Sequence, residues 1–144
     1  MESPACKMCG AGWRGLILLA STLAFGSAFA QESNAPVPAE IGQDGVQRAT
    51  VILDSYSYTP DHLVVQAGKP VELTLKNTAA VASHDLVLSP KAGLTIRQDV
   101  TAGNEAVLRF TPTVPGQFEF HCSKKMLFFK SHKQRGMVGT LEVR

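Results

Sequence analysis

The chain has 144 residues, of which 44% are hydrophobic and 18% are charged, and its formal net charge is +2 at pH 7. This length suits a single globular domain. The small net charge argues against nucleic-acid binding, which needs a strongly basic surface, so we expect no nucleic-acid partner.

The first thirty residues have the pattern of an export signal rather than of a folded domain. Lys7 and Arg14 give a basic start, the apolar run 15–25 follows, and residues 28–30 (AFA) offer a small-x-small cleavage site. The apolar run is too short to cross a bilayer comfortably. We therefore predict a signal peptide over residues 1–30 that is removed on export, and no membrane span in the mature chain.

Removal of this leader changes the number of cysteines available to the folded protein. Cys6 and Cys9 lie in the leader, so the mature chain keeps a single cysteine, Cys122. Export places it in a compartment that oxidises thiols, yet it has no partner for an internal disulfide. A lone thiol of this kind is either a small buried side chain or a ligand, and its neighbours in the sequence must distinguish the two.

The mature chain begins with a polar segment and continues with short strands. Residues 31–48 contain Pro36 and Pro38 and show no periodicity, which predicts a flexible N-terminal lead. The folded domain is predicted over 49–144, where runs rich in β-branched and aromatic residues are separated by turn residues. The expected strands are, in chain order, 50–58, 63–65, 71–75, 85–88, 94–100, 105–110, 116–122 and 137–143.

Eight short strands without a long helical pattern indicate an all-β sandwich or barrel. In the seventh strand, alternation places Phe118, Phe120 and Cys122 on one face, which we expect to point into the core. Glu119 and His121 would then point outward. Cys122 is thus predicted at the inner end of a strand, where a loop begins.

The residues around this loop suit a copper ion. Nine residues separate Cys122 from His132, four separate His132 from Met137, and His84 comes from an earlier strand. A cysteine thiolate with two imidazoles and a weak thioether is the ligand set of blue-copper sites. We therefore predict one copper ion per chain, with Met137 as the fourth ligand and Met126, in mid-loop, as the alternative thioether.

These segments resemble the cupredoxin family, which includes plastocyanin, azurin, pseudoazurin and the copper domain of nitrite reductase. The resemblance covers roughly residues 49–144. It rests on Ser83-His84-Asp85, on 118–122 (FEFHC), and on His132 followed by 136–139 (GMVG). It implies a single-domain, eight-stranded Greek-key β-sandwich with copper ligands at His84, Cys122, His132 and Met137.

The sequence departs from the family pattern in two places. The loop 123–131 is longer than in the small cupredoxins and closer to the nitrite-reductase type. Asp85 stands where the family often has Asn. A carboxylate can equally hydrogen-bond across to the cysteine loop and brace the ligands. Neither departure removes a ligand.

His121, next to Cys122, has two interpretations. In nitrite reductase an adjacent His-Cys pair joins the electron-transfer copper to a second, catalytic copper. A catalytic copper needs further histidines and an open position, and only His62 is unassigned, after the turn at Pro60 and Asp61. We favour a solvent-facing His121, no catalytic residues and no enzymatic activity.

The sequence therefore favours a periplasmic copper protein that transfers electrons. No acid–base pair stands out beside the copper ligands. The alternative is sequestration or delivery of copper in copper homeostasis or resistance, which favours clusters of Met or His, and the mature chain has few of either.

The long loop 123–131 leaves a further choice open. Its apolar residues lie between lysines. In one interpretation Leu127 and Phe129 pack beneath the loop and the lysines are merely solvated. In the other, which we favour, the apolar tip and the lysines form a docking face near His132 for an acidic redox partner.

Overall fold

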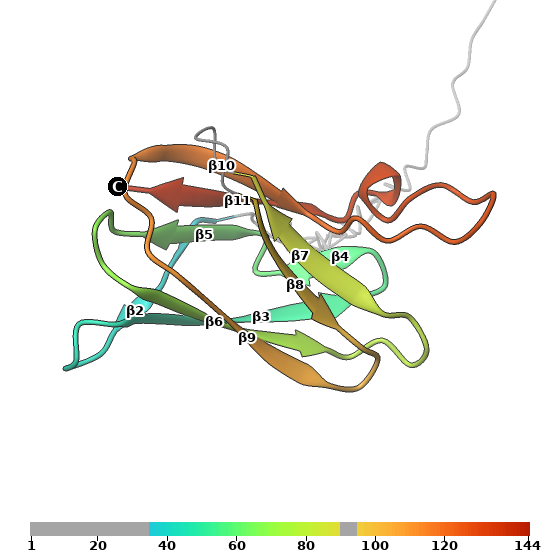
Figure 1. The fold of residues 1–144 in the computed structure, drawn as a ribbon, viewed down its shortest axis with the longest axis horizontal. Helices are drawn as coiled ribbons and strands as arrows, with labels where there is room; N and C mark the ends of the chain where they lie inside the picture. Colours follow the sequence, from blue (N-terminus) through green and yellow to red (C-terminus); the bar gives the residue numbers. More distant parts are fainter. Residues whose placement is uncertain (1–34, 90–94) are drawn as a thin grey trace, which may run out of the picture. The chain divides into compact units, whose positions relative to one another are not determined.

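The computed structural model describes residues 35–89 and 95–144 (Figure 1), which belong to one compact unit of the chain. The predicted signal peptide, residues 1–30, lies outside the described residues. Within the described ranges, no helix has the length and the apolar character needed to cross a membrane.

Eleven strands and one short 3₁₀ turn make up the described fold. They are β1 (Val37–Pro38), β2 (Glu40–Ile41), β3 (Gln47–Asp54), β4 (Ser57–Thr59), β5 (His62–Val65), β6 (Val71–Asn77), β7 (His84–Leu88), β8 (Ile96–Val100), β9 (Glu105–Phe110), β10 (Gly116–His121), η1 (Lys133–Arg135) and β11 (Val138–Val143). One sheet has the order β1-β5-β11-β10-β7-β8. The other has the order β2-β3-β6-β9, with β4 paired to β3.

This architecture confirms the predicted all-β sandwich, although the number of strands is eleven rather than eight. One difference lies in the run 50–58, which the sequence predicts as one strand. In the structure it divides into β3 and β4, joined by Ser55 and Tyr56, and the two strands form a tight hairpin in which Asp54 pairs with Ser57. The β-branched and aromatic composition of this run predicted a strand correctly but concealed the turn within it.

The polar lead predicted over 31–48 is the second difference. From Val37 onward it forms strands: β1 pairs in parallel with β5, and β2 pairs with β3. The strands β1 and β2 leave their side chains exposed, so they show no alternation of apolar and polar residues. These strands are held in the sheets by backbone hydrogen bonds, such as the bond from the Ala39 N–H to the Val64 carbonyl at 2.9 Å. Amino-acid composition does not reveal such bonds.

The core lies between the two sheets and is built from alternating strand residues. In β10, Phe118 and Phe120 are buried and Glu119 is exposed, as the alternation predicted. Phe120 lies opposite Gly139 of β11, where a Cβ would collide with the Phe120 ring and the Asp61 carbonyl. Glycine therefore lets this ring pack against the backbone of the neighbouring strand.

Two features of this arrangement position the site. Strands β7 and β10 are neighbours in one sheet, so His84 at the start of β7 lies near the end of β10. The connection from β10 to β11, which contains η1, projects beyond one end of the sandwich (Figure 1). The segment that carries the late candidate ligands therefore closes over that end.

Candidate metal centre

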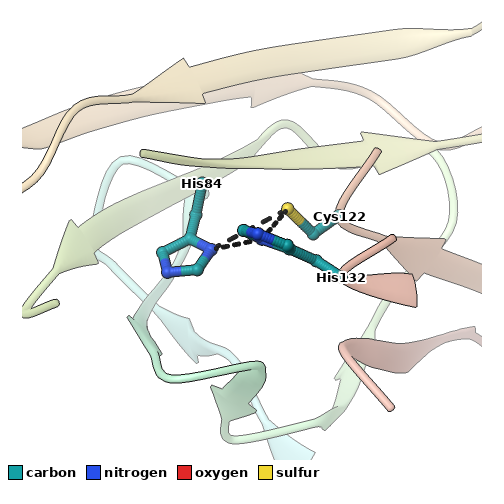
Figure 2. A group of neighbouring side chains, drawn as sticks. All are labelled: His84, Cys122 and His132. Carbon is teal, nitrogen blue, oxygen red and sulfur yellow. Dashed lines mark hydrogen bonds between the residues drawn. The ribbon is translucent and has the colours of Figure 1, made fainter. Parts of the chain in front are cut away.

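Three of the four predicted ligands come together at this end of the sandwich (Figure 2). The Cys122 Sγ lies 3.4 Å from the His132 Nδ1 and 3.8 Å from the His84 Nδ1, and the two Nδ1 atoms are 3.1 Å apart. All three side chains are buried. Within residues 35–89 and 95–144, this is the group of His, Cys, Asp and Glu side chains that is close enough to hold a metal ion.

The spacing of the three donors fits a metal ion at their centre. Metal bonds of about 2.0 Å to imidazole nitrogen and about 2.3 Å to thiolate sulfur place three coplanar donors about 3.5 to 3.7 Å apart. The observed separations of 3.1 to 3.8 Å bracket these values. One soft sulfur and two imidazole nitrogens in this arrangement suit copper.

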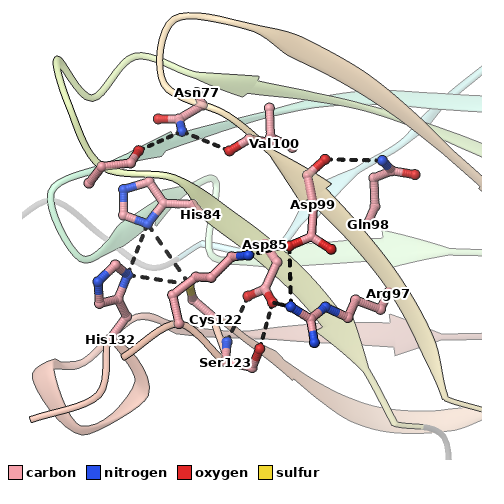
Figure 3. A network of polar contacts seen from close by, with 12 residues as sticks. Asn77, His84, Asp85, Arg97, Gln98, Asp99, Val100, Cys122, Ser123 and His132 are labelled. Carbon is pink, nitrogen blue, oxygen red and sulfur yellow. Dashed lines mark hydrogen bonds and ion pairs between the residues drawn. The ribbon is translucent and has the colours of Figure 1, made fainter. Parts of the chain in front are cut away.

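His84 is held at the start of β7 by the loop that precedes it. The buried Asn77 side chain donates to the carbonyls of Ala82 and Val100 at 2.9 and 3.0 Å (Figure 3). Its oxygen accepts from the Ala79 N–H at 3.0 Å. All of β7 is buried. The imidazole is therefore positioned by the body of the sandwich and not by a free loop.

The late residues are connected to one another through the backbone. The Cys122 N–H donates to the Met137 carbonyl at 3.2 Å, and the Met137 N–H donates to the His132 carbonyl at 3.0 Å. The His132 N–H donates to the Lys124 carbonyl at 2.9 Å. These bonds close the loop into a compact unit, so its ligands cannot move independently.

The two candidate thioethers differ in burial. Met137 is fully buried, in the same core cluster as Cys122, whereas the Met126 side chain is 64% exposed. Burial beside Cys122 favours Met137 as the thioether that would hold the metal, and its coordination to copper stays a prediction.

Asp85, the residue after His84, holds the loop that begins after Cys122 (Figure 3). Its buried carboxylate accepts hydrogen bonds from the Ser123 N–H at 2.7 Å and from the Ser123 hydroxyl at 2.5 Å. Arg97 pairs with the same carboxylate at 2.9 Å, and the Tyr58 hydroxyl donates to the Asp85 carbonyl at 2.6 Å. The hydrogen bond expected across to the cysteine loop is confirmed, and Arg97 gives the carboxylate a charge partner that an amide could not use.

Burial controls the protonation of the three donors. It raises the pKa of the Cys122 thiol to about 11. It also lowers the pKa of His84, with a further contribution from the nearby His132, and lowers the pKa of His132, with a further contribution from Arg135. At neutral pH the metal-free site therefore holds a thiol and two neutral imidazoles, and only the thiol must lose a proton for metal to bind.

The apolar tip of the long loop is exposed. The interpretation in which Leu127 and Phe129 pack beneath the loop is therefore wrong. The Leu127 side chain is 79% exposed, Phe128 is 99% exposed and Phe129 is 59% exposed. The Phe129 N–H donates to the Met126 carbonyl at 2.9 Å, which closes a turn that displays the side chains between them. Lys125 and Lys130 on either side are also exposed.

The two remaining histidines lie away from the three donors. His121 is half-buried, on the opposite face of β10 from the core, 3.6 Å from the Glu119 carboxylate. His62 is half-buried as well, and its Nε2 lies 3.3 Å from the Glu142 carboxylate. His121 therefore points away from Cys122, as the alternation predicted.

Tyr56 lies at the site although its sequence context did not predict it there. The ring of Tyr56 meets the ring of His132 edge to face, with 4.9 Å between centroids, and the Arg135 guanidinium lies 4.6 Å from the Tyr56 centroid. Tyr56 falls within the predicted strand 50–58. The turn-forming residues Asp54 and Ser55 just before it were the signal that could have revealed a turn there.

The chain is similar to known copper-binding proteins of one fold. The family model for the cupredoxin-like domain matches residues 15–138, and the chain belongs to this family. Copper is the metal that this fold and this donor set define. Among curated proteins, none matches the sequence.

Solved structures of copper proteins have the same fold. The Cu(I)-bound metal-binding domain of a Cu(I)-exporting P-type ATPase from Streptococcus pneumoniae D39 is 25% identical, with a TM-score of 0.59 over 78% of this chain and 98% of that one. A dithionite-reduced auracyanin from Roseiflexus castenholzii is 19% identical, with a TM-score of 0.57 over 74% of this chain and 98% of that one. Auracyanin A from Chloroflexus aurantiacus is 16% identical, with a TM-score of 0.57 over 69% of this chain and all of that one.

Proposed function

We propose that this protein is a periplasmic electron carrier that holds one copper ion per chain through His84, Cys122, His132 and Met137. The observation that carries the proposal is the convergence of the Cys122 Sγ and two imidazole Nδ1 atoms in one buried site. The bound copper supplies a one-electron couple between Cu(I) and Cu(II).

The residues of the chain make this site suitable for electron transfer by holding it rigid. Asp85 fixes Ser123, the residue after Cys122, and the backbone bond between Cys122 and Met137 joins the two ends of the loop. Donors that are held in place before the metal binds rearrange little between the two oxidation states. Burial of the thiol and of both imidazoles keeps water away from the donors.

The predicted signal peptide and the single cysteine of the mature chain support a periplasmic location. A free thiol in an oxidising compartment is at risk of oxidation unless it is buried or bound to a metal. Cys122 is fully buried and faces two imidazoles, an arrangement that protects it in that compartment.

The exposed loop supports the proposal that an acidic redox partner docks near His132. His132 retains 8% of its exposure, whereas His84 and Cys122 retain none, so electrons leave most directly through His132. Met126, Phe129 and Lys130 of the loop line one surface pocket together with His132, and Lys125 is exposed on the other side of the apolar tip. Such a surface combines an apolar contact with positive charge that steers an acidic protein.

A second candidate function is copper sequestration or delivery. It is supported by the similarity to the metal-binding domain of a Cu(I)-exporting ATPase, which is 25% identical to this chain. The two functions differ in the oxidation state that the site must hold. An electron carrier needs stable Cu(I) and Cu(II) forms, whereas a Cu(I) chaperone needs only the first.

The test is a visible spectrum and a redox titration of the copper-loaded mature protein. We expect an intense thiolate-to-copper band that disappears reversibly on reduction, one copper per chain, and loss of the band in Cys122→Ser. Ser123→Ala is the matched control, since it alters the neighbouring residue but keeps the thiolate. An unaltered band in Cys122→Ser would contradict the ligand assignment, and tight Cu(I) binding without a coloured Cu(II) form would favour copper handling.

A further inference from the structure

Tyr56 adopts a backbone conformation that its side chain does not favour. Its φ angle is +65°, in the left-handed region, where a bulky residue is an outlier. It occupies the third position of the turn between β3 and β4, Asp54 to Ser57, and turns with positive φ at this position usually take Gly or Asn there. Strain of this kind persists where the surrounding structure requires the side chain, and it often marks a functional site.

The side chain of Tyr56 is directed at one predicted copper ligand. Its ring meets the His132 ring at an interplanar angle of 87°, with 4.9 Å between centroids. This edge-to-face geometry is the favourable arrangement for two aromatic rings. Because His132 is the ligand that retains some exposure, Tyr56 covers the part of the site closest to solvent.

Arg135 contacts the other member of this pair, the Tyr56 ring, and lies in the same 3₁₀ turn as His132. The Arg135 N–H donates to the His132 carbonyl at 3.0 Å, so the two residues are joined by one 3₁₀ turn. Residues three apart in a 3₁₀ turn project from the same side. The guanidinium lies 4.6 Å from the centroid of the Tyr56 ring, within the range of a cation–π interaction.

We propose that Tyr56 and Arg135 form a cap that positions the His132 imidazole and slows its release from copper. The cap joins the β3–β4 turn of one sheet to the loop that leaves the other sheet, so it holds a loop ligand against the body of the sandwich. A surface pocket of about 150 Å³, lined by Tyr56, His132 and Arg135 together with loop residues, adjoins the cap. The proposal rests on the proposed copper site, and Tyr56 acts in it as a positioning residue.

The test compares Tyr56→Gly with Tyr56→Phe in the copper-loaded mature protein. Glycine relieves the positive φ but removes the ring, whereas phenylalanine keeps the ring and the strain. We measure the rate of Cu(II) loss to excess EDTA, the visible and EPR spectra, and the unfolding midpoint of the metal-free protein. Arg135→Gln removes the cation above the ring and keeps a polar side chain of similar length.

A positioning role predicts effects that packing alone does not produce. In Tyr56→Gly we expect Cu(II) loss at least about tenfold faster and altered spectra, as for other residues that support a metal ligand. We expect the metal-free unfolding midpoint to change little, because relief of the backbone strain offsets the loss of the ring's contacts with the core. Tyr56→Phe should match the wild type, and Arg135→Gln should fall between the two.

Equal rates of copper loss and equal spectra for Tyr56→Gly and the wild type would overturn the cap, as would a Tyr56→Phe variant that behaves like Tyr56→Gly. A second readout needs no copper: the ring-proton NMR shifts of His132 in the metal-free protein should change in Tyr56→Gly and not in Tyr56→Phe. Unchanged shifts in both variants would also overturn the cap. Failure of the copper site itself is recognised separately, by the absence of a thiolate band in the wild type.

Discussion

The Asp85 carboxylate accepts hydrogen bonds from both the N–H and the hydroxyl of Ser123, a residue 38 positions away that directly follows Cys122. The two oxygens of one carboxylate thus accept from both hydrogen-bond donors of the residue next to a predicted ligand. Asp85 also follows His84 directly in the sequence. The pair therefore couples the strand that carries the first ligand to the loop that carries the later ones.

This relationship predicts that Asp85→Ala is strongly destabilising. It leaves the Ser123 N–H without an acceptor and removes the buried charge that Arg97 neutralises. Leaving a donor such as the Ser123 N–H without its acceptor costs about 1 to 3 kcal/mol, and Arg97, whose side chain is 48% exposed, remains hydrated after the substitution, so we expect a loss of about 2 to 3 kcal/mol. Urea unfolding of the metal-free protein measures it.

Two further variants provide the controls for Asp85. Asp85→Asn keeps an acceptor for Ser123 and loses the pairing with Arg97, so we expect a smaller loss of about 1 kcal/mol. Asp99→Asn alters an exposed carboxylate that also pairs with Arg97, and we expect a change within about 0.5 kcal/mol. A similar effect for Asp85→Ala and Asp99→Asn would show that Asp85 does not brace the loop.

Met137→Leu should keep copper bound and raise the reduction potential. A weak thioether donor stabilises Cu(II) more than Cu(I), so its removal favours the reduced form. Met126→Leu is the matched control, since that side chain is 64% exposed and we expect its replacement to leave the potential unchanged. Redox titration of both variants decides between the two sulfurs, and a shift in Met126→Leu alone would reverse the assignment.

The stability of the metal-free protein should fall at both ends of the pH range. Burial lowers the pKa of His84 and of His132 from 6.5, so below that pH the unfolded chain takes up protons that the folded chain does not bind. Stability is therefore lost as the pH falls below 6.5 towards the lowered pKa values. Thermal unfolding as a function of pH measures this loss, and a constant midpoint below pH 6.5 would contradict it.

The alkaline loss has a different source. Burial raises the pKa of Cys122 from 9.0 to about 11, so between these values the unfolded chain loses a proton that the folded chain retains. Stability should fall as the pH rises through this interval. Cys122→Ala removes the thiol and should reduce the dependence in this interval, and the remainder comes from Tyr58, whose pKa burial raises above 10.0. An undiminished dependence in Cys122→Ala would contradict the assignment to Cys122.

Electron transfer to an acidic partner should slow steeply with salt, because charge steering is screened over about 10 Å at 0.1 M ionic strength. The structure selects the lysines to test. Lys124 pairs with Asp99, whereas Lys125 and Lys130 are exposed on either side of the apolar tip. Lys125→Glu with Lys130→Glu should reproduce the slowing at low salt without a change in the copper spectrum, measured by stopped-flow mixing. Equal rates for variant and wild type at every salt concentration would show that this loop does not take part in docking.

Much of the fold could be predicted because strand signals are local. The predicted strand 105–110 agrees with β9 at both ends, and the burial of Phe118, Phe120 and Cys122 follows from their alternation. The strands β1 and β2 could not be predicted in this way. They are edge strands that form through backbone hydrogen bonds to residues distant in the sequence. Amino-acid composition does not indicate such bonds.

By itself, the sequence determined the types of the candidate ligands and the strands within or beside which they lie, since both depend on the identity and spacing of nearby residues. Only the tertiary structure decided how the ligands are held. Tyr56 and His132 lie 76 positions apart, and their contact depends on a turn with positive φ in one sheet and a loop leaving the other. Contacts of this range depend on how the two sheets pack, which short-range periodicity does not encode.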